Sequence, residues 1–152
     1  MAVNMNRRKL LIGGLAAGLV LNVIDFLANA VIFAERMQAD ANAFKAGLGD
    51  AMGTMEGGQI AMYVFFDFVI GFLLVWTYAA IRPRFGPGPR TAAYVAMVFF
   101  AFGLILSFGY KEIGVMSPGL WWSYSALWFV NLLVASLVGA LLYSEDESPA
   151  TV

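Results

Sequence analysis

Four long apolar segments restrict what this chain of 152 residues can become more than any other feature. Each segment has at least the ~20 residues that an α-helix needs to cross a bilayer. Charged and helix-breaking residues are gathered between the segments, where a membrane protein has its loops. The sequence therefore predicts an all-α fold with four transmembrane helices in one domain, over residues 10–34, 60–81, 91–110 and 120–143.

The composition agrees with a membrane protein and narrows the possible chemistry. Hydrophobic residues make up 61% of the chain and charged residues 12%, about half the charged share of a soluble protein. The chain has no Cys and no His, so thiol chemistry, disulfides and His- or Cys-ligated metals are excluded. A formal net charge of −1 gives no basic field for nucleic acid. We therefore expect no enzyme activity, no cofactor and no metal site.

The distribution of Lys and Arg predicts how the helices are oriented. Three cations, Arg36, Lys45 and Lys111, fall on one predicted side of the membrane, and six fall on the other. Because the more positive side stays in the cytoplasm, both termini should be cytoplasmic, with residues 144–152 as a short acidic tail. We expect a multi-pass protein of the plasma membrane, with anionic lipid near its six inner cations, which are Arg7, Arg8, Lys9, Arg82, Arg84 and Arg90.

Residues 35–59 are too polar to cross the membrane and too many for a turn. Their apolar residues recur every three or four positions, which predicts an amphipathic helix over about residues 35–48 on the outer surface. A Gly-rich link through Gly57 and Gly58 should follow. This outer segment can serve as a lid or docking surface, or simply as a connector that shields the top of the bundle.

The first helix has an alternative interpretation as a secretory signal. Basic residues 7–9 precede an apolar stretch that reaches Ala28-Asn29-Ala30, which imitates a cleavage site. The apolar run continues to Ala34, however, which makes it longer than a usual signal core. A retained first helix is favoured.

A polar face runs along the first helix, since Gly14, Gly18, Asn22, Asp25 and Asn29 follow one another at steps of three or four. An ionisable group in hydrocarbon is costly, so this face should lie against protein, and the glycines allow close approach. Each other helix has a similar seam of small or polar residues. The predicted packing positions are Gly14, Gly18, Gly71, Gly103 and Gly139, and the predicted intramembrane polar site is Asn22, Asp25, Asn29, Asp67, Ser107 and Asn131.

Two acids of this site should lie at similar depth. Counting ~1.5 Å per residue, Asp25 lies roughly 13 Å and Asp67 roughly 10 Å below the outer boundary. Two adjacent carboxylates in a low dielectric share a proton or are neutralised by a cation, so a proton or cation site is one interpretation. The other is a polar core that only fixes helix register, which pairing of Asp25 with Arg36 or Lys111 would favour.

Three stretches of the chain are similar to a known group of proteins. They are residues 7–14 running into 21–23, the run at 76–91 that contains Arg82-Pro83-Arg84-Phe85-Gly86-Pro87-Gly88-Pro89-Arg90, and the last helix around 135–143. With these stretches the chain resembles a family of small four-helix bacterial integral membrane proteins of unknown function. The resemblance implies the fold and no site residues.

Two functions remain open from the sequence. The first is an integral membrane protein with a structural or accessory role, whose outer half contains a polar pocket and which has a membrane-protein partner or a second copy of itself. The second is a proton-coupled carrier of a small substrate that uses Asp25 and Asp67.

Overall fold

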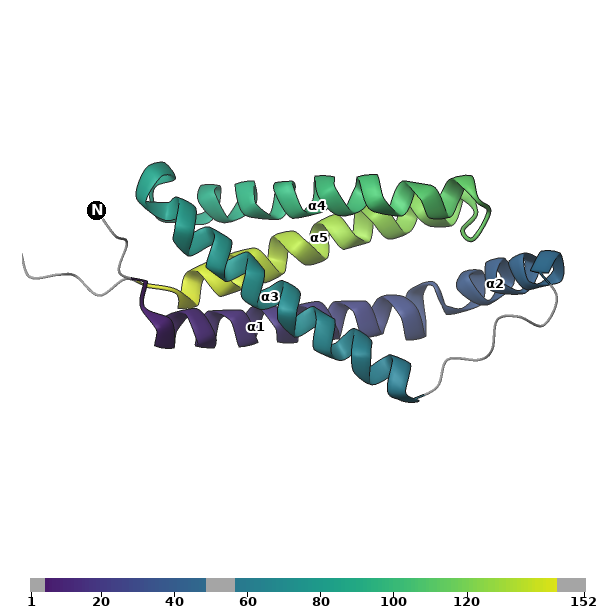
Figure 1. Cartoon of the computed structure of the whole chain (residues 1–152), viewed down its shortest axis with the longest axis horizontal. Helices are drawn as coiled ribbons and strands as arrows, with labels where there is room; N and C mark the ends of the chain where they lie inside the picture. Colours follow the sequence, from purple (N-terminus) through teal and green to yellow (C-terminus); the bar gives the residue numbers. More distant parts are fainter. Residues whose placement is uncertain (1–4, 49–56, 145–152) are drawn as a thin grey trace, which may run out of the picture.

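The structure, a computed structural model, describes residues 5–48 and 57–144, and in these it contains five α-helices and no strand (Figure 1). Four of them are long and apolar enough to cross a membrane, with the first lengthened by the π-helical turn η1. The prediction of an all-α chain with four such helices is confirmed. The helices are α1 (Arg7–Leu27), α2 (Ala34–Leu48), α3 (Gly57–Phe85), α4 (Pro89–Glu112) and α5 (Pro118–Leu142), and η1 covers Ala28–Ile32.

Local sequence explains where these helices begin. The side chain of Asn6 accepts a hydrogen bond from the backbone N–H of Lys9 at 3.0 Å and caps α1. Helices α4 and α5 both start with a proline, which has no N–H to lose at that position. Gly88, just before α4, has φ = 116°, a value that side chains rarely allow. The turn from α3 to α4 is therefore short and makes the two helices antiparallel neighbours.

Two boundaries differ from the prediction. Helix α3 continues to Phe85 rather than ending at Ile81, because Pro83 removes only one N–H donor and helical bonding resumes after it, with the Gly86 N–H donating to the carbonyl oxygen of Arg82 at 2.8 Å. The expected loose link through Gly57 and Gly58 is wrong for these two residues, since α3 begins at Gly57. The rest of that link, residues 49–56, lies outside the described residues.

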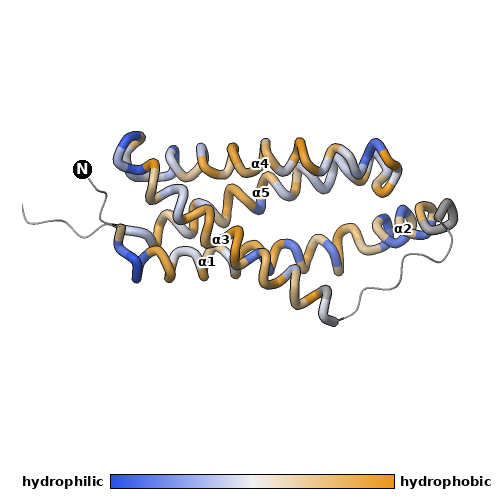
Figure 2. The backbone as a smooth tube through the Cα atoms, in the orientation of Figure 1, coloured by the Kyte–Doolittle hydropathy of each residue, from blue (hydrophilic) through white to orange (hydrophobic). Residues whose placement is uncertain are grey.

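The four long helices pack together most closely in one half of the molecule. We call the end that holds Arg7, Phe85 and Leu142 the inner end and the opposite end the outer end. Figure 2 shows hydrophobic residues along all four helices, with hydrophilic residues mainly at the ends and on α2. The buried residues of α4 all lie in its inner half. The largest fully buried apolar side chains of the inner core are Leu21, Leu74, Val75, Val95 and Leu132.

Helices α1 and α3 cross at glycines. A Cβ added to Gly71 would overlap the backbone of Gly18 and lie 2.8 Å from the carbonyl oxygen of Gly14. A Cβ on Gly18 would lie 2.8 Å from the Cα of Phe68. The glycine face of the first helix therefore lies against α3, backbone to backbone.

Other glycine contacts join α5 to its neighbours. A Cβ on Gly139 would lie 3.3 Å from the carbonyl oxygen of Gly13, so α1 and α5 also approach closely. Gly103 of α4 faces the indole ring of Trp128 instead, with no room for a methyl group. Gly139 thus lies close to the backbone of α1, whereas Gly103 makes room for the ring of Trp128.

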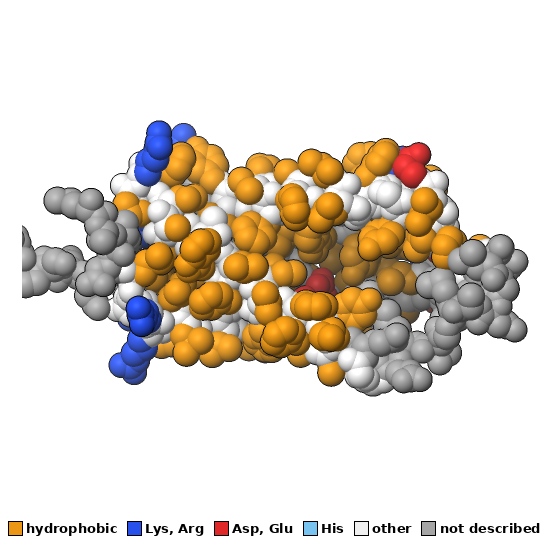
Figure 3. All heavy atoms as spheres, in the orientation of Figure 1, with side chains coloured by type: hydrophobic (Ala, Val, Ile, Leu, Met, Phe, Trp, Pro, Cys, Tyr) orange, Lys and Arg blue, Asp and Glu red, His pale blue; other side chains and the backbone are white. Residues whose placement is uncertain are grey.

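The outer half of the bundle is open on one side. Helix α3 diverges from α4 and α5 beyond its crossing with α1 (Figure 1), and every side chain from Ile60 to Phe66 is exposed. Figure 3 shows this face hollowed, with acidic side-chain atoms among hydrophobic ones near the middle of the molecule. We call this hollow on the open side of the outer half the outer cleft.

Helix α2 is attached to the outer end by two contacts. Asp40 Oδ2 accepts a hydrogen bond of 2.7 Å from the backbone N–H of Ser117, just before α5. Phe33, at the junction of η1 and α2, is buried in a small second cluster with Ala28 and Leu120. These contacts hold the start of α2 beside the turn between α4 and α5.

Candidate functional site

A buried amide holds one of the two acids. Asn131 of α5 is 0% exposed, and its Nδ2 donates to Asp25 Oδ1 at 2.8 Å and to the carbonyl oxygen of Leu21 at 3.3 Å. Both acceptors belong to α1 and lie one turn apart. The other amide atom, Asn131 Oδ1, is buried and has no hydrogen-bond partner among the residues described. An acceptor without a donor therefore lies beside the Asp25 carboxylate.

A second amide extends the site toward the outer end. Asn29 Nδ2 donates to the backbone carbonyl of Asp25 at 2.7 Å and to the Tyr124 hydroxyl at 3.1 Å. Asn29 lies within the π-helical turn η1, whose extra residue changes the direction in which the following side chains point. Such turns occur frequently at functional sites.

Tyr124 is a site residue that sequence reasoning missed. It interacts electrostatically with both Asp25 and Asp67, besides its hydrogen bond to Asn29. A signal was present, because Tyr124 precedes Asn131 by seven residues on α5, two helical turns along the same face.

Asp67 reaches the site from α3, one turn beyond the glycine crossing. It is half-buried and close enough to Asp25 for the two carboxylates to interact electrostatically. In the described part of the chain Asp67 makes no hydrogen bond and no ion pair. The structure thus brings together one acid that is held by an amide and one that is not.

Asn22 is directed to backbone atoms rather than to the acids. Its Nδ2 donates to the carbonyl oxygen of Gly18 at 2.9 Å and to that of Val64 on α3 at 3.4 Å. It therefore joins α1 to α3 just outside their crossing and lies beside the acid pair as a structural support.

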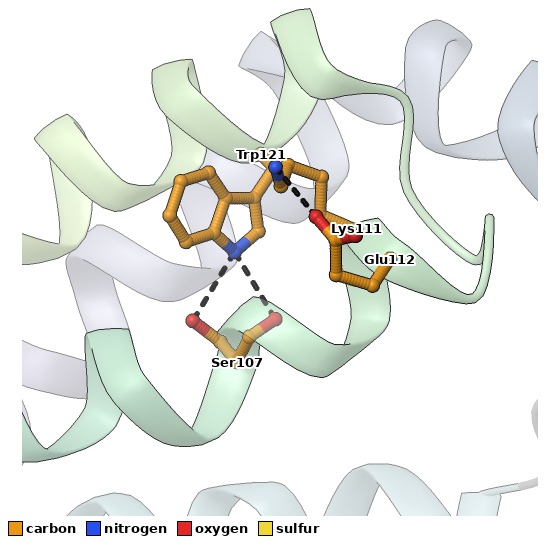
Figure 4. A network of polar contacts seen from close by, with 4 residues as sticks. All are labelled: Ser107, Lys111, Glu112 and Trp121. Atoms are coloured by element: carbon orange, nitrogen blue, oxygen red, sulfur yellow. Dashed lines mark hydrogen bonds and ion pairs between the residues drawn. The ribbon is translucent and has the colours of Figure 1, made fainter.

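Ser107 lies in a separate polar cluster near the outer end of α4 and α5 (Figure 4). Trp121 Nε1 donates to the carbonyl oxygen of Ser107 at 3.1 Å and to its Oγ at 3.2 Å. The expectation that Ser107 joins the carboxylates is corrected here, because its face of α4 meets the indole of α5. Ser107 is part of helix packing at that position.

Lys111 also belongs to this cluster. Its Nζ lies 2.8 Å from Glu112 Oε1 and 4.3 Å from the centre of the Phe108 ring. Neither Asp25 nor Asp67 forms an ion pair with any described residue, Arg36 included. Among the described residues Asp25 is therefore not paired with Lys111 or Arg36. Such a pair would have favoured a purely structural core.

The remaining chemistry of the site is acceptor-rich and anionic. Two carboxylates and the free Asn131 oxygen accept hydrogen bonds. Among the described residues no group of three or more His, Cys, Asp or Glu could hold a metal ion. The arrangement suits a proton or a singly charged cation, because two acids that interact repel each other unless a positive charge joins them.

The basic residues gather at the inner end, where Figure 3 shows Lys and Arg side chains at one end of the molecule. Arg82 lies over the Tyr143 ring at 5.9 Å, and Arg90 Nε donates to the Tyr94 hydroxyl at 2.8 Å. A shallow groove beside the start of α1 is lined by Asn6, Arg8, Lys9 and Ile12.

Comparison with known proteins adds no relative. No protein-family profile matches the chain, and no characterised protein or solved structure is significantly similar to it. The function must therefore be inferred from the geometry of the site itself.

Proposed function

We propose that this chain is an integral protein of the plasma membrane with four transmembrane helices and both termini in the cytoplasm. Its surface supports this proposal, since large apolar side chains are exposed along the long helices, for example Leu141 at 83% and Ile105 at 73%. Such a surface suits lipid and not water. Helix α2, with Asp40 held beside α5, then lies at the outer membrane surface.

The orientation can be tested with reporter fusions. A reporter active only in the cytoplasm, fused at the C-terminus, should be active, and the same reporter inserted after Lys45 should be silent, because six cations lie at the inner end and three at the outer. A reporter active only outside the cytoplasm serves as the reciprocal control. An exported C-terminus would contradict the orientation.

The inner cations support contact with anionic lipid. The ends of α1, α3 and α4 that hold these cations lie together at the inner end (Figure 1). Each basic residue near an anionic membrane surface adds about 1 kcal/mol of attraction. The groove lined by Arg8 and Lys9 is one place where a headgroup fits.

For the polar site we infer a proton-coupled carrier of a small substrate, with Asp25 and Asp67 as the residues that exchange the proton. The observation that supports this inference is Asp67, which has no hydrogen bond or ion pair in the described part of the chain. A polar core that served only to fix helix register would satisfy both carboxylates, since an unpaired acid in the bilayer is costly.

The surroundings of the acids support exchange with the outside. Asp67 is half-buried rather than buried, which leaves part of the residue accessible to a proton or a substrate. When the site is empty, a proton shared by the two acids reduces their repulsion. A positively charged substrate would displace that proton, and the competition between the two couples their movement.

A structural or accessory role is the second candidate, and the Asp25–Asn131 hydrogen bond favours it. A charge-assisted bond of 2.8 Å between α1 and α5, with Asn131 fully buried, fixes the two helices against each other. In that role a membrane-protein partner or a second copy of the chain would cover the open face of α3.

The carrier can be distinguished from the accessory role by proton exchange. We expect purified wild-type protein in detergent to release protons reversibly between about pH 5 and pH 9, where a desolvated carboxyl titrates. Asp67→Asn should reduce this release and keep the fold, because no described residue depends on Asp67 for a hydrogen bond. The matched control is Glu112→Gln, an exposed acid at the outer end. Identical release by all three proteins over this range would contradict the carrier.

A further inference from the structure

The polar site has more hydrogen-bond acceptors than donors among the described residues. Asn131 Oδ1 is a buried acceptor without a donor, and Asp67 has two carboxylate oxygens without a donor, among the residues described. Asp25 Oδ1 accepts from Asn131 Nδ2, which comes from the same amide as the free oxygen. Buried polar atoms in native proteins nearly always have partners, so a ligand for this site should bring several donors.

The charge of the site limits the ligand further. The two carboxylates interact electrostatically, and no Lys or Arg is paired to either in the described part of the chain. A divalent ion such as Ca²⁺ takes about six to eight oxygens, more than these two acids and one amide provide. A bare monovalent cation could be coordinated by these oxygens, but it has no apolar part that would favour an apolar route to the site. A primary ammonium has one positive charge and three N–H donors on one atom.

The route to the site is apolar. The outer cleft lies on the open side of the bundle (Figure 3), and the outer half of α3 exposes Tyr63, Phe65 and Phe66. The hollow in Figure 3 has hydrophobic side chains around the acidic atoms. In a bilayer such a cleft is reached from the lipid side, where an alkyl chain partitions favourably.

Building on the carrier proposed above, we propose that its substrate is a primary alkylammonium amphiphile, with the ammonium group between Asp25, Asp67 and Asn131 and the alkyl chain in the outer cleft. Its three N–H groups donate to the two carboxylates and to Asn131 Oδ1. The ammonium supplies the positive charge that the shared proton supplied before, and that proton leaves to water. The only covalent change is the transfer of that proton, in which its O–H bond to the carboxylate breaks and a new O–H bond to water forms.

The test compares two ligands with the same charge and chain, octylammonium and octyltrimethylammonium. The protein is placed in phosphatidylcholine nanodiscs, and binding to each ligand is measured by calorimetry against empty nanodiscs. Loss of the N–H donors leaves several buried acceptors unpaired, so octylammonium should bind at least about 10-fold more tightly. Equal affinities would overturn the proposal, since they would mean attraction by charge and apolar surface alone.

Substitutions in the polar site test whether octylammonium binds there. Asp67→Asn should weaken octylammonium binding at least about 10-fold, whereas the matched acid change Glu112→Gln should leave it unchanged. If Asp67→Asn binds octylammonium as wild type does and melts at the same temperature, the proposal fails. The second variant Asn131→Leu should weaken binding as well, and a melting curve with the ligand absent checks its fold.

Two further measurements identify the source of the amine and separate this proposal from the carrier. Phosphatidylethanolamine and a free alkylamine both have a primary ammonium group. If octylammonium binds more weakly in phosphatidylethanolamine nanodiscs, the lipid headgroup competes for the site and is a ligand. If its binding is unchanged, the ligand is a free amine. Proton release without selectivity for octylammonium would overturn the substrate class and leave the carrier standing. Selectivity without proton release would support the ligand class and overturn the coupling.

Discussion

Replacing Gly71 with alanine is expected to lower the free energy of unfolding by about 1–3 kcal/mol or more. The added Cβ would overlap the backbone of Gly18 and lie 2.6 Å from its Cα. A clash with a side chain can be relieved by rotation, but a clash with backbone requires α1 and α3 to separate. Thermal melting or denaturant titration of the purified protein in detergent measures the loss.

The matched control is Gly109→Ala on α4. No atom lies within 4 Å of a Cβ at that position, and alanine is a better helix former than glycine by about 1 kcal/mol. This variant should therefore be as stable as wild type or slightly more stable. If Gly71→Ala and Gly109→Ala melt at the same temperature, the glycine crossing is not the packing contact described above.

The second large effect is expected at Asp67. Asp67→Leu should raise the free energy of unfolding by ~1–3 kcal/mol, because it removes an unpaired carboxyl from an apolar environment. The same change should reduce proton release between about pH 5 and pH 9 below that of wild type. A gain in stability together with a loss of function is typical of a residue retained for a site.

The stability of Asp67→Leu should be compared with that of Asp25→Leu. Asp25→Leu leaves Asn131 Nδ2 without its acceptor at 2.8 Å, in a residue that is fully buried, so stability should fall by about 1–3 kcal/mol. The two acids should thus respond in opposite directions in the same melting experiment. A fall in stability for Asp67→Leu as large as for Asp25→Leu would favour the structural role for both.

The helices themselves could be predicted because length and apolar composition determine them. Their ends were harder to predict, as Pro83 shows. A proline usually stops a helix, and the sequence does not show that α3 continues past Pro83 at the loss of one backbone hydrogen bond. Gly57 was read as part of a link for a similar reason, since glycine is unfavourable within a helix but tolerated at its first residue.

The candidate site could be predicted in part. Depth counting placed Asp25 and Asp67 at one level, and the structure has them in electrostatic contact. Ser107 could not be placed by the same reasoning. A periodic pattern shows which face of a helix is small or polar but not which helix that face meets, and the face of α4 with Gly103 and Ser107 meets Trp128 and Trp121.

The glycine crossing also determines how the bundle can move. Side chains that interdigitate resist rotation of one helix over another, because each must leave the groove it occupies. At Gly18 and Gly71 the two backbones touch directly, so rotation of α3 over α1 meets no interlocked side chain at this pair, whereas Val75 of α3 packs against Gly13 and Gly139 further inward. If α3 rotated so that its outer half approached α4 and α5, its inner half, with Leu74 and Tyr78, would move away from them. In the carrier that we propose, this rotation would open the acid pair to either end in turn and never to both at once.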